Sequence, residues 1–281
     1  MAQFIGDVME IKKIGIVSLG LIGGSLLKAL FNKGFELYAV TRNKDTIELA
    51  SDYCHAISDN LSLLSNCDIV FVCSPMNKTI EILDNLETIV SQDTIVCDVC
   101  SLKQFVMEKT RPYNFIGTHP MAGTEHSGFN YSFEALFDGA KWILTPAENV
   151  SDDIVKLVEE LIISIGAIPL SMTPAEHDSA VAMISHMPMV VSQALVASIM
   201  GNDYARKLAA SGFRDTTRLA LSNLEMANDM VMLNNQNIRD ALNLFIKSAQ
   251  DLLDNTYSEK IEDIRNFRAD MYNSAGKNIS N

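Results

Sequence analysis

The sequence predicts an α/β domain built on a mostly parallel sheet, followed by an all-helical domain. Three observations support this. Short apolar runs alternate with helical patterns up to Met172, as in parallel sheets covered by helices on both faces. Beyond Met172 the strand patterns stop, and helical periodicity continues to about residue 273. The length of 281 residues suits two domains. We therefore expect domains at 1–172 and 173–281.

Seven strands are expected in the first domain. Each is a short run of apolar, often β-branched residues bounded by polar or turn residues. The expected strands are Ile14–Val17, Glu36–Thr41, Asp68–Cys73, Thr94–Asp98, Phe115–Thr118, Trp142–Thr145 and Ile168–Met172.

The helices expected between these strands carry apolar residues on one side. Gly34 stands where a helix commonly ends, and Ser151 stands at an N-cap position before two acidic residues. The expected helices are Leu21–Lys33, Asn43–Tyr53, Lys78–Val90, Leu102–Lys109 and Asp152–Ile165.

The second domain has helix-start patterns but no strand patterns. Thr173 and Glu176 have capping-box spacing around a proline at the first helical position. Ser222 with Glu225, and Thr256 with Glu259, have the same spacing and predict two further helix starts. One apolar face is expected on the helix Asn235–Thr256, formed by Ile238, Leu242, Phe245, Ile246 and Leu253.

Composition excludes some classes of partner. With 22 basic and 35 acidic residues the net charge is −13, so we expect binding to neither nucleic acid nor an anionic membrane. The most apolar stretch, Ala180–Met200, contains His186, Pro188 and other polar residues. This content favours a buried core or dimer-packing helix over a membrane span.

The cysteines indicate a reducing compartment. All five lie in the first 100 residues, and an odd count in apolar surroundings is typical of cytosolic proteins. Cys97 and Cys100 have CxxC spacing, but no second pair follows. We therefore expect a cytoplasmic protein without a metal site.

A glycine-containing turn follows the first strand. The segment Ser18-Leu19-Gly20-Leu21-Ile22-Gly23 joins this strand to a helix, which is the position of the dinucleotide fingerprint in Rossmann-like domains. Ser18, Gly20, Leu21, Ile22 and Gly23 are therefore expected to contact a cofactor pyrophosphate. Ser18 replaces the first glycine, which leaves the turn geometry open. The alternative is a purely structural turn.

The end of the second strand bears on the cofactor ribose. NAD-binding proteins usually carry an acidic residue there, whereas this chain has Thr41-Arg42-Asn43. Arg42 can pair with a 2′-phosphate, with Thr41 and Asn43 adding hydrogen bonds. The pattern favours NADP, and NAD remains the alternative if Arg42 is only a solvated residue. Ser74, after the third strand, is expected among the cofactor residues.

His119 is the principal catalytic candidate. It directly follows the strand Phe115–Thr118, and ligands of open parallel sheets bind beyond the carboxyl ends of the strands. A neutral imidazole is a suitable base for oxidising an alcohol near pH 7 when a nicotinamide takes the hydride.

Four segments resemble the prephenate and arogenate dehydrogenases of tyrosine biosynthesis. They are Gly20–Ser25, Asp98–Lys103, Thr118–Gly128 and Ser185–Pro188, and the resemblance extends from about Lys13 to Arg268. It implies a nucleotide-binding domain and a helical domain that forms a homodimer. It also implies a small-molecule substrate: prephenate, converted to 4-hydroxyphenylpyruvate, or arogenate, converted to tyrosine, with hydride transfer and loss of CO2.

The resemblance also implies roles for residues near the reacting ring. His119 would bond the ring hydroxyl and take its proton, and Ser101 would lie between that hydroxyl and the nicotinamide. Glu125 and His177 match residues at the pocket entrance. Ser101 has an alternative as the cap of the helix Leu102–Lys109, and His177 has one as a solvated residue.

Three residues of the second domain are candidate substrate ligands, two of them through the resemblance. His186 matches a pocket histidine, and Arg218, with Arg214 in the same segment, matches an arginine associated with the substrate carboxylates. The alternatives are a core role for His186 and a surface ion pair of Arg214 with Asp215 or Asp240. Met189 replaces a second histidine of many relatives, so feedback by tyrosine stays undecided.

Two other functions remain open at this stage. One is a different two-domain hydroxyacid dehydrogenase that binds NAD(P), although it would leave the segment Thr118–Gly128 and His186 without a role. The other is a non-catalytic nicotinamide-sensing protein, which would tolerate the loss of His119.

Overall fold

The computed structural model describes residues 10–124 and 126–276. Contacts divide the chain into two compact units. The sheet unit comprises the described part of Met1–Asp178 together with Asn223–Leu233, and the helical unit comprises Ser179–Ser222 and the described part of Asn234–Asn281. The domain boundary expected at residue 172 stays a prediction.

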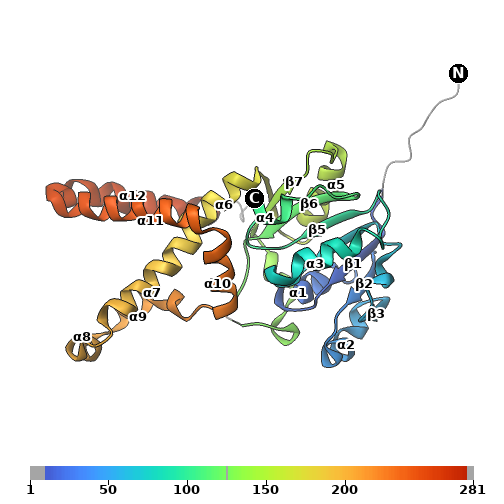
Figure 1. The fold of residues 1–281 in the computed structure, drawn as a ribbon, viewed down its shortest axis with the longest axis horizontal. Coiled ribbons are helices and arrows are strands. Elements are labelled where there is room, and N and C mark those ends of the chain that lie inside the picture. Colours follow the sequence, from blue (N-terminus) through green and yellow to red (C-terminus); the bar gives the residue numbers. More distant parts are fainter. Residues whose placement is uncertain (1–9, 125, 277–281) are drawn as a thin grey trace, which may run out of the picture. The chain divides into compact units, whose positions relative to one another are not determined.

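An eight-stranded sheet forms the centre of the sheet unit (Figure 1). Its strand order is β3-β2-β1-β4-β5-β6-β7-β8. Neighbouring strands are parallel except β6 and β7. The first six positions have the strand order of dinucleotide-binding domains, which confirms the expected α/β class. The strands are β1 Lys13–Val17, β2 Glu36–Val40, β3 Ala56–Ser58, β4 Ile69–Val72, β5 Ile95–Asp98, β6 Asn114–Pro120, β7 Lys141–Pro146 and β8 Ile168–Ser171.

Two strands differ from the expectation. The edge strand β3 was not expected, because three half-buried residues make too short a run to show alternation. Strand β6 is longer than expected and includes His119 itself. The extension arises from the antiparallel ladder with β7, in which His119 lies opposite Ile143.

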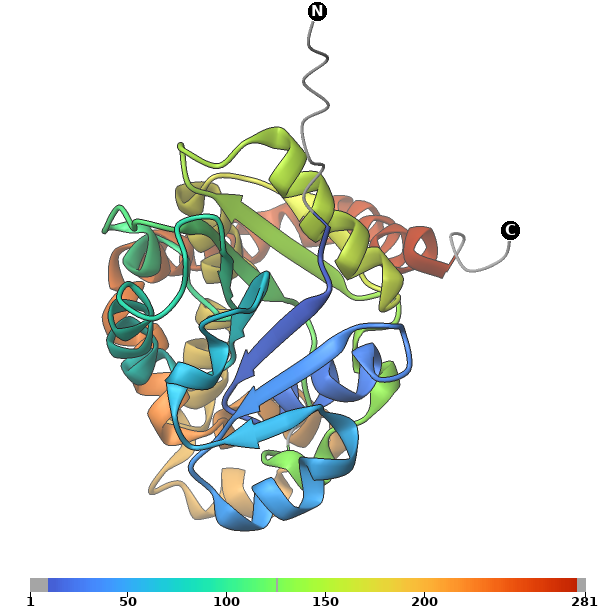
Figure 2. The same ribbon diagram turned by 90° about the vertical axis from the view of Figure 1, so that its right-hand side faces the viewer.

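Helices cover both faces of the sheet. The main core joins the sheet to α1 (Leu21–Leu30) and α5 (Asp152–Ser164) through residues such as Leu27 and Val158. Figure 2 shows these two helices together on one side of the strands. Along β4, Ile69 and Phe71 belong to this core whereas the buried Val70 and Val72 do not. This is the alternation of a sheet covered on both sides, with α3 (Met76–Leu86) and α4 (Gln104–Met107) on the other face.

Several helix ends were placed wrongly from the sequence. The helix expected to reach Lys33 ends at Leu30, because Phe31 leaves the helical region and Asn32 has a left-handed φ of 65°. The other expected helices are observed as α2 Lys44–Ala50 with the short helix η1 Ser51–Tyr53, α3 and α4. The remaining short helices of the first 150 residues are η2 Leu61–Leu64, η3 Phe129–Tyr131 and η4 Glu134–Phe137.

A long apolar helix begins at Pro174 with the expected capping box. The Thr173 N–H donates to Glu176 Oε2 at 2.9 Å, and the Glu176 N–H donates to Thr173 Oγ1 at 3.2 Å. The helix continues through α6 (Pro174–Val181), the π-helical η5 (Ala182–His186) and α7 (Met187–Ile199). The helix is 26 residues long and contains an 18-residue window with a mean hydropathy of 1.6, so length and composition alone would allow a membrane span. Such a test is also passed by core helices of soluble proteins.

Two expected helix starts are wrong in detail. Helix α10 is capped by Asn223, whose Oδ1 accepts the Met226 N–H at 3.0 Å, and not by Ser222. No new helix starts at Thr256, because α11 continues through the π-helical η7 into α12. The later elements are α8 Asp203–Leu208, α9 Ser211–Thr216, η6 Arg218–Leu221, α10 Leu224–Leu233, α11 Asn235–Asp251, η7 Leu252–Thr256 and α12 Tyr257–Gly276.

Candidate active site

The turn after β1 is tight although its first position is a serine. Ser18 has a φ of 70°, in the left-handed region that glycine adopts most easily. Its N–H donates to Val40 O on the neighbouring strand at 2.8 Å. Serine therefore takes the conformation that the fingerprint normally assigns to glycine.

The next two glycines serve different purposes. A Cβ on Gly23 would lie 2.1 Å from Ser18 O and 3.0 Å from Cys73 Cβ. The absence of a side chain at Gly23 therefore lets the start of α1 pack closely against the residues that follow β1 and β4. A Cβ on Gly20 would meet nothing within 4 Å, which leaves its backbone accessible to a ligand. The first N–H groups of α1 precede its first intrahelical bond, from the Gly24 N–H to Gly20 O at 2.9 Å. Such groups bind phosphates, and the cradle fits a dinucleotide pyrophosphate.

The tip of β2 offers a cation and polar groups. Arg42 is exposed and Thr41 is half-buried. Asn43 Oδ1 accepts the Thr46 N–H at 3.1 Å, so this side chain caps α2. Ser74, at the tip of β4, is buried, and its hydroxyl lies 2.9 Å from the Thr79 hydroxyl. The expected cofactor residues thus lie at the carboxyl ends of the neighbouring strands β1, β2 and β4.

Ser101 and His119 lie at the same edge of the sheet. Ser101 follows β5, and His119 is half-buried near the end of β6. Strand β6 is three positions from β1, which at about 4.8 Å per strand is roughly 14 Å. An extended dinucleotide crosses the edge of such a sheet from one half to the other. A pyrophosphate bound at the glycine turn would therefore leave the other half of the dinucleotide on the side of His119.

His119 belongs to a hydrogen-bonded chain. Its Nδ1 lies 2.9 Å from His177 Nε2, and His177 Nδ1 lies 2.7 Å from Asp178 Oδ1. A carboxylate only accepts, so His177 Nδ1 carries a proton and, in the neutral ring, His177 Nε2 accepts. His119 Nδ1 is then the donor, and the lone pair of a neutral His119 is on Nε2.

Asp178 also caps the short helix after β5. Its Oδ1 accepts the Lys103 N–H at 2.8 Å, and its Oδ2 accepts the Gln104 N–H at 2.9 Å. The helix begins at Gln104, so the alternative role of Ser101 as its cap is wrong. His177 is buried, and its alternative as a solvated residue is therefore also wrong.

A buried ion pair supports the strand residue before His119. Lys103 Nζ donates to Asp98 Oδ2 at 2.5 Å and to Thr118 O at 2.5 Å. Asp98 Oδ1 accepts the Thr118 N–H at 3.2 Å. Lys103 and Asp98 are fully buried. Asp98, Lys103 and Asp178 were not predicted as site residues from the sequence, although the acidic residue at the end of an apolar strand was a usable signal for Asp98.

In the helical unit, the histidine and the arginines have different surroundings. His186 is buried, and its Nδ1 lies 3.2 Å from Asn234 Nδ2. Arg214 is paired with Asp215 at 3.0 Å, and its side chain is 77% exposed. Arg218, the first residue of η6, is exposed. The structure thus contains the surface ion pair between Arg214 and Asp215, which was the alternative to a role of Arg214 in binding substrate. Glu125 lies outside the described residues.

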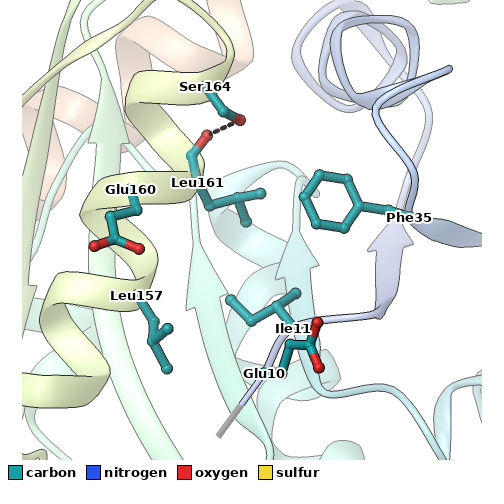
Figure 3. Close-up of a pocket in the computed structure, with 7 residues that line it drawn as sticks. All are labelled: Glu10, Ile11, Phe35, Leu157, Glu160, Leu161 and Ser164. Atoms are coloured by element: carbon teal, nitrogen blue, oxygen red, sulfur yellow. Dashed lines mark hydrogen bonds between the residues drawn. The ribbon is translucent and has the colours of Figure 1, made fainter. Parts of the chain in front are cut away.

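A cavity of about 460 Å³ lies away from these groups (Figure 3). Its walls come from α5 and from residues that precede β1 and β2, at the opposite edge of the sheet from His119. No expected site residue lines it. Although large cavities are the default candidates for active sites, the chemistry-bearing groups of this chain lie elsewhere. The lining residues are Glu10, Ile11, Phe35, Leu157, Glu160, Leu161 and Ser164.

The cysteines are free thiols with low reactivity. Burial raises the pKa of Cys54 to about 11 and that of Cys67 to about 12. Burial also raises the pKa of Cys97 and Cys100, which disfavours thiolate chemistry at the CxxC sequence. Within residues 10–124 and 126–276, no group of three or more His, Cys, Asp or Glu side chains is arranged to hold a metal ion.

Both parts of the chain match one family. Residues 26–169 match the nucleotide-binding domain of prephenate dehydrogenase, and residues 173–271 match its dimerization domain. The prephenate dehydrogenase of Bacillus subtilis is 30% identical over 89% of this chain and 71% of its own length. The cyclohexadienyl dehydrogenase of Zymomonas mobilis is 26% identical over 86% of this chain and 87% of its own length.

Solved structures agree with this match. Synechocystis arogenate dehydrogenase has a TM-score of 0.80 and 32% identity, covering 94% of this chain and 99% of that one. The prephenate dehydrogenase of Aquifex aeolicus, in complex with hydroxyphenyl propionate and NAD+, has a TM-score of 0.79 and 28% identity, covering 95% and 98%. By contrast, the 3-hydroxybutyryl-CoA dehydrogenase of Escherichia coli, with a TM-score of 0.50 and 11% identity, shares only the fold.

The glycine turn, the histidine at the end of β6 and the agreement of both domains with one family lead to one assignment. The chain belongs to the prephenate dehydrogenase family, and it is an NAD(P)-dependent dehydrogenase that carries out an oxidative decarboxylation in tyrosine biosynthesis.

Proposed function

We propose that the substrate is prephenate or arogenate and that His119 is the catalytic base. The observation that carries this proposal is the position of His119, at the same edge of the sheet as the glycine turn and hydrogen-bonded through His177 to Asp178. A proton on Nδ1 directs the basic lone pair of the neutral ring to Nε2, which suits removal of a hydroxyl proton.

The electron balance of the reaction requires one base and no metal. When bound, the nicotinamide accepts a hydride from the carbon that bears the ring hydroxyl. His119 takes the hydroxyl proton, so that carbon becomes a carbonyl. The ring carboxylate then leaves as CO2, and its electron pair makes the ring aromatic. The resulting phenolate oxygen takes back the proton from His119, and Ser101 is proposed to hydrogen-bond the same oxygen.

The substrate carboxylates are assigned to cations of the helical unit. A dianion bound by a protein of net charge −13 needs local positive charge, and Arg218 supplies a bidentate donor. Arg214 and His186 are proposed as further ligands, and His177 and Glu125 as groups at the pocket entrance. Glu125 is the candidate for distinguishing an amine from a ketone. Initial rates with prephenate and arogenate, each with NAD and NADP, measure these preferences.

The cofactor is proposed to be NADP. Arg42 is exposed at the tip of β2, where an acidic residue would select the ribose hydroxyls of NAD. A guanidinium there supports a 2′-phosphate, with Thr41 and Asn43 as neighbours. Arg42→Ala is expected to raise Kd for NADP about 10-fold or more while changing Kd for NAD little. Equal weakening of both cofactors would rule out this assignment.

Assembly and location complete the proposal. We infer a homodimer formed through the helical domain, residues 173–281, with the nucleotide-binding domain at 1–172. The match of residues 173–271 to a dimerization domain supports the dimer. The similarity to prephenate and arogenate dehydrogenases supports a cytoplasmic location.

The catalytic role is tested by His119→Asn. We expect turnover to fall by at least about 100-fold, while Kd for the cofactor stays within about twofold. The matched control is His55→Asn, since His55 is exposed at the start of β3 and its Nδ1 accepts the Leu37 N–H at 3.2 Å. Unchanged turnover in His119→Asn would favour a non-catalytic nicotinamide-binding protein instead.

A further inference from the structure

Lys103 is bound at both of its ends to groups that hold His119. At the side-chain end, its Nζ donates to Thr118 O, one residue before His119. At the backbone end, its N–H donates to Asp178 Oδ1, the oxygen that also accepts from His177 Nδ1. His177 in turn bonds His119.

Together with two peptide links, these hydrogen bonds form a closed ring of five residues. The ring runs from Lys103 to Thr118, along the peptide to His119, across to His177, along the peptide to Asp178 and back to Lys103. The bond from Lys103 Nζ to Thr118 O fixes the backbone next to His119. The bonds through Asp178 and His177 fix the orientation of the His119 imidazole. Lys103 is therefore linked both to the backbone next to His119 and to the carboxylate that bonds His177.

The geometry of Lys103 is fixed by packing as well as by hydrogen bonds. Its side chain is fully buried, and Asp98 balances its charge. A Cβ on Gly117 would lie 3.4 Å from Lys103 Cδ, 2.9 Å from Met107 Sδ and 2.5 Å from Thr145 Oγ1. Because Gly117 has no side chain, there is room for the aliphatic part of Lys103 and for the neighbouring side chains of Met107 and Thr145.

We propose that Lys103 is a positioning residue for the dehydrogenation, which holds His119 in place and in the tautomer protonated at Nδ1. This inference rests on the proposed role of His119 as the base. Lys103 makes no contact with the reacting atoms in the proposed reaction, and its effect reaches them only through Thr118 and Asp178.

The first test is spectroscopic and uses the wild-type enzyme. With only five histidines in the chain, ¹⁵N-histidine labelling and single His→Asn variants assign each ring. We expect His119 protonated at Nδ1 in wild type. In Lys103→Met the backbone N–H is kept, but loss of the Nζ bonds to Thr118 and Asp98 frees the Lys103 backbone to shift away from Asp178 Oδ1, so we expect a mixture of tautomers. A wild-type His119 protonated at Nε2 would overturn the proposal whether or not any Lys103 variant folds.

The second test is kinetic. Lys103→Met and the charge-balanced double variant Asp98→Asn with Lys103→Met are expected to lower kcat about 10- to 100-fold, with Kd for the cofactor unchanged within about twofold. The matched control is Lys109→Met, which removes a lysine paired with Glu87 at 2.7 Å outside the ring and should keep wild-type kcat.

The outcomes separate this inference from the proposed function. If His119→Asn is inactive while a folded Lys103 variant keeps wild-type kcat and the wild-type tautomer, only the role of Lys103 is overturned. If His119→Asn is active, the base assignment falls and the Lys103 proposal falls with it. Loss of kcat together with a changed His119 tautomer supports both.

Discussion

The proposed catalytic groups of the sheet unit and the proposed substrate arginines of the helical unit have opposite surroundings. In the sheet unit, Asp98, Lys103, His177 and Asp178 are all buried and bonded to one another or to backbone. In the helical unit, Arg214 and Arg218 are exposed. The catalytic geometry is therefore built within one compact unit, whereas the proposed substrate cations stand at a surface.

Apolar residues show a similar contrast outside α10, which belongs to the sheet unit although its Leu224 is 85% exposed. The strongly exposed large apolar side chains of the helical unit include Leu221 at 90%, Leu253 at 83% and Leu208 at 80%. In the sheet unit the main core is closed between the strands, α1 and α5. Extended exposed apolar surface marks an interaction site, and this unit matches a dimerization domain. The helical unit is therefore the part expected to need a second copy.

The largest expected effect concerns the buried chain of the sheet unit. In Asp178→Asn an amide N–H at the Oδ2 position would face the Gln104 N–H, and one at the Oδ1 position would face the Lys103 N–H and make His177 Nδ1 an acceptor. The His177 proton would then move to Nε2, and His119 would carry its own proton on Nε2, the nitrogen needed as base. A wrong tautomer of this kind costs up to about 10⁴-fold in turnover in other enzymes.

We therefore expect Asp178→Asn to lower kcat by about 10²- to 10⁴-fold with little change in cofactor affinity, measured by steady-state kinetics and cofactor titration. Asp84→Asn is the control, because Asp84 pairs with Arg111 and Lys109 away from His119. Wild-type kcat in Asp178→Asn would show that the tautomer of His119 is set by something else.

A second prediction compares one exposed isoleucine from each unit. Ile246 of α11 is 44% exposed and Ile163 of α5 is 58% exposed. If the helical unit forms the dimer, Ile246→Asp should raise the dimer dissociation constant about 30-fold or more, whereas Ile163→Asp should leave it unchanged. Sedimentation at several protein concentrations measures both. If the two variants changed the dimer dissociation constant equally, or not at all, the helical unit would not be the part that forms the dimer.

The smallest expected effects separate two glycines of the cofactor turn. Gly20→Ala places a methyl group in open space, so stability should stay within about 0.5 kcal/mol, while cofactor affinity falls about 10-fold. Gly23→Ala forces a Cβ to within 2.1 Å of Ser18 O, so the turn must move at a cost of about 1–3 kcal/mol. Denaturant unfolding and cofactor titration of both variants distinguish binding from packing.

The parts of this protein that depend on local sequence were predictable. Apolar runs located seven of the eight strands, and the capping box at Thr173 formed as expected. The glycine turn and His119 were recognised because fixed spacing around a strand end is itself a local pattern. The errors at helix ends, as at Leu30, arose because single residues such as Asn32 decide where a helix stops.

The tertiary structure alone decided how the site is held together. The bond between His119 and His177 joins residues 58 positions apart, and the bond between Lys103 and Asp178 joins residues 75 positions apart. Periodicity reports which face of an element is buried, but it carries no information about which distant side chain meets that face. The strand order placed Asp98, Lys103 and Asp178 around His119, and burial then required each of their polar atoms to find a partner.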